Sequence, residues 1–191
     1  MADATDDFER ASLGANWTVS LGAVTIVGSS DVRGNSAGAD SLTRWNANTF
    51  NGDHYSEVVV TTGDDDGGGP AVRHQSGAVT CYAWMMPTTD IWTMYEITAG
   101  SYAVLGANYS IAGSTNTGTT ARLSVTGSTL TPSIDGGAQA TRTDASITGG
   151  GPGIGFFATT VSFESWLGGP IAAAAASLIF KSNPMQHLLV R

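Results

Sequence analysis

Alternating apolar and polar residues on either side of a glycine turn give the clearest structural signal in this chain. Residues 121–126 and 129–134 each alternate, and Gly127-Ser128 separates them. Successive side chains of a strand point to opposite faces, so each stretch has one apolar and one polar face. The pattern predicts a β-hairpin with one face covered by a second layer. The side chains predicted to face the core are Leu123, Val125, Leu130 and Ile134.

Pro132 lies within the second half of this hairpin. A proline has no N–H to donate to a ladder, so we expect its strand to lie at an edge or to bend there.

Further short β-rich stretches follow one another along the chain, separated by turns rich in Gly, Asn, Ser and Asp. Short strands at this spacing predict an antiparallel sandwich. The other predicted strands are Trp17–Val19, Ala23–Val27, Tyr55–Thr62, Ala71–Arg73, Val79–Met86, Ile91–Ala99, Tyr102–Leu105, Thr141–Thr143, Gly153–Phe157 and Val161–Trp166.

Composition supports strands joined by tight turns. The 191 residues include 25 glycines, and only 13% are charged, against an average of about 25%.

The net charge of −8, with Lys181 as the one lysine, argues against a nucleic-acid partner. No apolar run approaches the roughly 20 residues that a membrane-spanning helix needs. Cys81 is the single cysteine, so an intrachain disulfide is excluded and we expect a small buried side chain.

The character of the chain changes near its end. Residues 168–191 contain no acidic residue and begin with Gly168-Gly169-Pro170, which we interpret as a joint between a body at 1–167 and an apolar tail. Folding back over the body is the alternative to docking on a neighbouring subunit. The side chains predicted to dock are Leu178, Ile179, Phe180, Met185, Leu188, Leu189 and Val190.

Several short phrases occur in an order that resembles the laminin-G-like branch of the concanavalin A-like lectin/glucanase superfamily. The resemblance extends over roughly Asp6 to Trp166 and implies two packed antiparallel sheets of jelly-roll type, with the first and last strands side by side. It does not imply one function, because this fold hosts many. The phrases are Asp7-Phe8, Gly14-Ala15-Asn16-Trp17, Tyr55-Ser56-Glu57-Val58, Gly69-Pro70-Ala71-Val72-Arg73, Ala99–Gly106, Arg122–Gly127, Ile134-Asp135-Gly136, Thr143-Asp144, Gly151–Gly155 and Val161–Trp166.

Hydrolases of that superfamily carry a Glu-x-Asp-x-x-Glu strand, and this chain has no such motif. None of Glu9, Glu57, Glu96 and Glu164 is followed by the required carboxylates, although a glycosidase needs a pair of them. We therefore expect no enzymatic activity.

The resemblance also implies calcium as the usual cofactor. Asp64, Asp65 and Asp66, in a glycine-rich loop, offer oxygen ligands, and Asp6, Asp7 and Glu164 form a second candidate set. A solvated acidic turn is the alternative at the first set, and our expectation is that the protein needs no cofactor.

Glycan sites combine an exposed aromatic platform with a few polar groups. Tyr82, Trp84, Trp92 and Tyr95 are the candidates for such a platform, and filling the sandwich core is the alternative role for them.

The function predicted first is that of a structural, non-enzymatic subunit of a large assembly. The segment MADATDDFER lacks the apolar stretch of a signal peptide, the tail is apolar, and phage particles commonly carry laminin-G-like modules. These features predict a tailed-phage virion component, a head decoration or tail appendage, made in the host cytoplasm and forming a homo-oligomer or contacting other subunits. The alternative is a carbohydrate-binding module for adhesion to a glycan surface.

Overall fold

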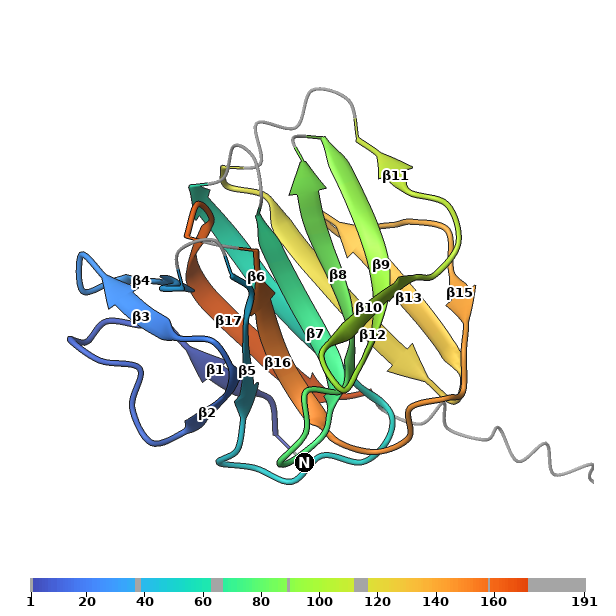
Figure 1. Cartoon of the computed structure of the whole chain (residues 1–191), viewed down its shortest axis with the longest axis horizontal. Helices are drawn as coiled ribbons and strands as arrows, with labels where there is room; N and C mark the ends of the chain where they lie inside the picture. Colours follow the sequence, from blue (N-terminus) through green and yellow to red (C-terminus); the bar gives the residue numbers. More distant parts are fainter. Residues whose placement is uncertain are drawn as a thin grey trace, which may run out of the picture.

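The computed structural model describes residues 2–36, 39–62, 67–88, 90–111, 117–157 and 159–171. Regular structure in these ranges consists of β-strands, which form two antiparallel sheets packed face to face (Figure 1). The all-β jelly-roll sandwich predicted from the sequence is thereby confirmed. The described ranges contain no helix with the length and apolar character needed to cross a membrane.

One sheet, sheet A, contains the hairpin that the alternation predicts. Its edge-to-edge order is β14 (Gly137–Ala138), β13 (Thr129–Ile134), β12 (Thr120–Thr126), β6 (His54–Thr62), β17 (Ser162–Pro170), β4 (Asp31–Gly34) and β3 (Val24–Val27), with β1 (Ala4–Asp6) paired to β17 and β15 (Arg142–Thr143) paired to β13.

The other sheet, sheet B, faces it across the core. Its order is β10 (Ser101–Val104), β9 (Ile91–Thr98), β8 (Cys81–Thr88), β7 (Gly68–His74), β16 (Gly151–Phe156), β5 (Ser41–Trp45) and β2 (Trp17–Leu21), with β11 (Tyr109–Ser110) paired to β9.

The β12–β13 hairpin has the predicted register. Leu123 lies opposite Pro132 and Val125 opposite Leu130, and the turn begins with Gly127 at a φ of 56°, a conformation that suits the first position of a two-residue hairpin loop. Leu123, Val125 and Leu130 are fully buried and Ile134 packs partly buried against them, so the predicted core face is confirmed.

Pro132 lies at a position of β13 where no neighbouring strand would accept a hydrogen bond from its backbone nitrogen. On that side β14 pairs with Ser133 and Ile134, while β15 pairs with Thr129 and Leu130. The gap between these two short strands falls at Pro132, which accepts a hydrogen bond from the Gln139 N–H through its carbonyl.

The first and last strands of the described body lie side by side, as the resemblance implies. Thr5 on β1 pairs with Leu167 on β17. The predicted joint at 168–170 is wrong, however, because Gly168 pairs with Ser56 and Pro170 pairs with His54 on β6. These residues complete the longest ladder of sheet A, so the sandwich extends to Pro170. The predicted docking residues, between 178 and 190, lie outside the described residues.

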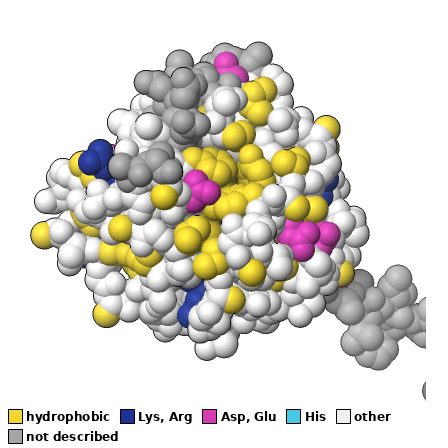
Figure 2. All heavy atoms as spheres, viewed as in Figure 1, with side chains coloured by type: hydrophobic (Ala, Val, Ile, Leu, Met, Phe, Trp, Pro, Cys, Tyr) yellow, Lys and Arg dark blue, Asp and Glu magenta, His cyan; other side chains and the backbone are white. Residues whose placement is uncertain are grey.

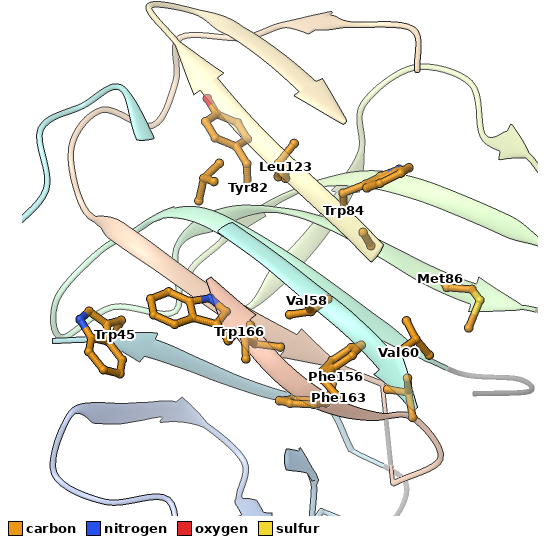
Figure 3. Close-up of a cluster of buried hydrophobic side chains, with 14 of the residues drawn as sticks. Trp45, Val58, Val60, Tyr82, Trp84, Met86, Leu123, Phe156, Phe163 and Trp166 are labelled. Atoms are coloured by element: carbon orange, nitrogen blue, oxygen red, sulfur yellow. The ribbon is translucent and has the colours of Figure 1, made fainter. Parts of the chain in front are cut away.

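The main core fills the space between the sheets. Side chains from β6, β12 and β17 of sheet A meet side chains from β5, β8 and β16 of sheet B (Figure 3). At one end Trp166 contacts Trp17 and Trp45 with ring centroids 4.8 and 4.9 Å away. The hydroxyl of Ser56 accepts a hydrogen bond from Trp166 Nε1 and donates one to the carbonyl of Gly153, which links the two sheets inside the core.

Candidate functional site

Strand β8 is buried on both faces, which is unusual for a two-layer sandwich with one core. Tyr82, Trp84 and Met86 point into the main core. Cys81, Ala83 and Met85 point the other way and join a second buried cluster whose members all come from sheet B or a segment continuing it. The outward side of sheet B is therefore covered. The fully buried members of this outer cluster are Leu42, Ala71, Cys81, Ala83, Met85 and Ile97.

Three half-buried aromatic side chains pack against the outer cluster. Tyr95 on β9, Tyr102 on β10 and Phe157, just after β16, meet edge to face or tilted, with ring centroids 5.7 to 6.0 Å apart. We call these three residues the aromatic roof. In Figure 2, which has the orientation of Figure 1, hydrophobic side chains gather near the middle of the face where β8 and β9 lie.

Small residues make the roof possible. Ala83 lies opposite Ala71 on the neighbouring strand β7 and opposite Tyr95 on β9. A Cβ at Gly155 would approach Leu42 and the Met85 sulfur to 3.0 Å. These small residues leave space on the outward face of sheet B. The rings of Tyr95, Tyr102 and Phe157 fill that space and shield the outer cluster from solvent.

Polar groups accompany the roof. Burial and the neighbouring Asp40 carboxylate raise the pKa of the Tyr102 phenol, and burial raises the pKa of Tyr95. The Tyr102 hydroxyl oxygen is buried, with Asp40 beside it. Both phenols therefore stay protonated at neutral pH. The half-buried Asp40 lies beside them as an acceptor.

His74 at the end of β7 is fully buried. Its Nε2 lies 2.7 Å from the Ser20 hydroxyl, which also donates to the carbonyl of Leu42. Burial, with a contribution from Arg44, lowers the pKa of His74 to about 4. The imidazole is thus neutral at neutral pH.

The platform predicted from the sequence is wrong in three of its four residues. Tyr82, Trp84 and Trp92 have no exposed surface. Trp84 and Trp92 pack against each other in the main core with centroids 4.6 Å apart, so the core alternative holds for them. Tyr95 is the one member that lies on the outward face.

The other two roof residues were not predicted to have this role. Tyr102 and Phe157 are 55 positions apart in the sequence, and only the strand order of sheet B brings them to within 6.0 Å of each other. The available signal was the apolar character of both faces of the stretch from Val79 to Met86, which indicates a strand with no solvent-facing side.

A cavity of about 490 Å³ lies elsewhere, against β1, β6 and β17 of sheet A. Its buried carboxylate, Asp6, already accepts hydrogen bonds from both terminal nitrogens of Arg10 and from Trp17 Nε1. Burial alone raises the pKa of Asp6, but these hydrogen bonds outweigh it and hold that pKa below its usual value. The groups that line this cavity are thus largely satisfied within the protein.

The structure describes only one of the two candidate calcium sites. Asp64, Asp65 and Asp66 lie outside the described residues. In the second set Asp6 is engaged by Arg10 and Glu164 is exposed. Within the described ranges, no cluster of three or more His, Cys, Asp or Glu side chains is arranged to hold a metal ion.

Cys81 is the small buried side chain that the sequence predicts. It has no exposed surface and forms no disulfide. Burial raises the pKa of its thiol to about 12, so it is not a nucleophile at neutral pH.

Comparison of the sequence with family models and with curated proteins yields no match. Solved structures do match. The carbohydrate-binding module CBM66 from Bacillus subtilis superposes with a TM-score of 0.65 at 20% identity, over 81% of this chain and 95% of that one. The match confirms the jelly-roll sandwich fold of this chain.

Other similar structures span several activities. The exoplasmic/lumenal domain of VIP36, in a form bound to Ca²⁺ and Man3GlcNAc, has a TM-score of 0.60 at 12% identity, over 85% of this chain and 86% of that one. LamAcat from Zobellia galactanivorans has a TM-score of 0.56 at 7% identity, over 86% and 96%. At these identities the likeness concerns the fold alone. The predicted phage function gains no support from these structures, and the alternative prediction is the better supported of the two.

Proposed function

We propose that this chain is a non-catalytic carbohydrate-binding module that holds a glycan against the aromatic roof on the outward face of sheet B. The observation that carries the proposal is the half-buried cluster of Tyr95, Tyr102 and Phe157 beside Asp40. The fold similarity to a carbohydrate-binding module and to a glycan-bound lumenal domain supports it.

The chemistry of the roof suits a sugar. A pyranose ring has C–H groups on its faces and hydroxyls around its edge. An aromatic ring covers the C–H face, while a polar group beside it, such as the Asp40 carboxylate, exchanges hydrogen bonds with the edge. Binding a glycan to the roof also costs little side-chain entropy, because Tyr95 and Phe157 already contact each other before the glycan arrives.

A pair of carboxylates on the other side of sheet B, the side that faces sheet A, does not have the character of a catalytic pair. The Ser146 hydroxyl lies 2.7 Å from Glu96 Oε1 and 2.6 Å from Asp144 Oδ1. Hydrogen bonds from Ser146 and Tyr82 lower the pKa of Asp144. The general acid of a glycosidase needs the opposite shift, since it must hold a proton at neutral pH.

The binding test compares Tyr95→Ala with a matched control. Affinity electrophoresis against a panel of soluble polysaccharides, followed by calorimetry on the best one, should show at least about tenfold weaker binding for Tyr95→Ala, a change of about 1.4 kcal/mol. Val19→Ala removes a side chain that is 38% exposed on the edge strand β2 and should bind as the wild type does. Equal binding by all three proteins, or no binding to any glycan, would reject the proposal.

Catalysis is tested separately. Reducing-sugar assays on laminarin, agar and the best-bound polysaccharide should show no turnover. Turnover that disappears in Glu96→Gln or Glu57→Gln would contradict the non-catalytic assignment.

A further inference from the structure

A second, polar cavity of about 430 Å³ opens at the end of sheet B where β5 and β7 finish and β16 begins. This volume falls in the roughly 300–1,000 Å³ range of small-ligand sites. Three loops, following β5, β7 and β15, supply most of its wall. The side chains that distinguish it are Arg44, Asn46, Asn48, Phe50 and Gln75, with Gly151 at its base.

Arg44 is the only charged residue among those that line this cavity. It is half-buried, and within the described ranges its guanidinium has no hydrogen-bond or ion-pair partner. Other arginines are engaged: Arg10 by Asp6 and Arg122 by Glu57. A guanidinium with five donors, half removed from solvent and left unpaired, is a ready partner for an anion.

The floor of the cavity is shaped by a glycine. From a Cβ built on Gly151, the nearest atoms include Phe50 Cδ2 at 3.7 Å and Arg44 Nη1 at 3.9 Å. The absence of a side chain at Gly151 thus leaves room between an aromatic edge and a guanidinium.

The remaining wall is neutral and rich in amides. Trp45 Nε1 donates to Asn48 Oδ1, which orients that amide, and Gln75 Nε2 lies 3.4 Å from the Thr148 carbonyl, a long contact that a ligand can replace. The adjacent His74 is neutral, since burial and Arg44 lower its pKa to about 4. One positive charge among neutral donors and acceptors matches a ligand with one acid group and several hydroxyls.

We propose that this cavity binds the carboxylate-bearing unit of an acidic glycan, a uronic acid, with Arg44 pairing the carboxylate and the amides of Gln75 and Asn48 contacting the ring hydroxyls. This assignment rests on the proposed glycan-binding function and specifies the class of glycan. The arginine fork fits a carboxylate through two parallel hydrogen bonds. Phe50 supplies the apolar contact for the ring.

The probes are D-galacturonate and D-galactose, which differ in the acid group at C6. Titrations followed by amide and arginine Nε NMR shifts should show galacturonate shifting the signals of Gly151, Gln75 and Arg44. We expect galactose to bind at least about tenfold more weakly. Arg44→Gln should weaken galacturonate binding at least about tenfold, and Arg44→Lys should retain part of it, because an ammonium gives the charge without the fork.

The matched control is Arg122→Gln, which changes the net charge equally but on the outer face of sheet A, where Arg122 pairs with Glu57. It should bind galacturonate as the wild type does. Gly151→Ala places a methyl group at ordinary contact distance from its neighbours, so the fold should persist while the cavity shrinks and binding falls.

Three results would overturn the inference: equal affinity for galactose and galacturonate, undiminished binding by Arg44→Gln, or acetate binding as tightly as galacturonate, which would indicate a simple anion site. Failure here is distinguishable from failure of the proposed function. Polysaccharide binding that depends on Tyr95, with galacturonate binding absent or independent of Arg44, rejects the inference alone. Galacturonate binding that depends on Arg44, with no polysaccharide held at Tyr95, rejects the roof as the glycan site.

Discussion

The two faces of β8 show how one strand serves two different layers. Toward sheet A it presents Tyr82, Trp84 and Met86, large side chains that a whole opposing sheet covers. Away from sheet A it presents Cys81, Ala83 and Met85, smaller on average and covered only by other side chains of sheet B and the roof. Both sets are fully buried, but a second sheet closes the first and three partly exposed rings close the second.

This difference separates the part of the molecule that stabilises the fold from the part proposed to bind a ligand. The main core is continuous and contains most of the buried apolar side chains, so it dominates the free energy of folding. The roof residues keep one side toward solvent and bury the other against the outer cluster. A ligand can therefore use the roof without disturbing the inter-sheet packing.

The largest expected effect is in the main core. Leu123→Ala should lower the free energy of unfolding by about 2–5 kcal/mol, because Leu123 is fully buried between the sheets. Ser124→Ala, on the opposite face of the same strand, should stay within about 0.5 kcal/mol. Tyr95→Ala at the half-buried roof should fall between them, at about 1–2 kcal/mol. Urea denaturation measures all three, and a loss for Tyr95→Ala equal to that for Leu123→Ala would place the roof in the structural core.

An intermediate effect concerns pH. The pKa of His74 is about 4 in the folded protein and about 6.5 when exposed. The unfolded chain therefore binds more protons between these values, so stability is highest above about pH 6.5 and declines toward pH 4. The pKa difference corresponds to roughly 3 kcal/mol.

Denaturation of wild type and His74→Gln at pH 7, 5.5 and 4 isolates this contribution. The difference in stability between the two proteins should move in favour of His74→Gln as the pH falls. Parallel pH profiles would show that His74 is not the buried neutral group described above. His54, whose pKa burial also lowers, is common to both proteins and cancels.

The smallest effect is in the accessibility of Cys81. Its thiol lies beneath the roof with a pKa near 12, so iodoacetamide at pH 8 should not label the native protein within hours and should label it fully in denaturant. Tyr95→Ala should label faster than wild type, because part of the cover is gone. The rates for Tyr95→Ala and Leu123→Ala are compared after each is corrected for its loss of global stability. Equal corrected rates would indicate that the roof does not protect the thiol.

Several features of this protein follow from local sequence. The alternation around Gly127 determined the hairpin and its register, since each apolar residue on the wrong face would lose its burial. The many short β-rich stretches and the turn residues between them determined the fold class. The burial of Cys81 was likewise predictable, because a small apolar side chain in an alternating strand is normally buried.

The site was decided by tertiary structure. Alternation on β8 shows two apolar faces but not which of them a second sheet covers, so the sequence left open whether Tyr82 and Trp84 form a platform or fill the core. Gly168-Gly169-Pro170 has the composition of a joint, yet pairing with β6 makes it strand. The roof and the Arg44 cavity bring together residues from strands and loops far apart in the sequence, and their proximity depends on the order of strands in sheet B. That order is set by non-local pairing, which no local pattern encodes.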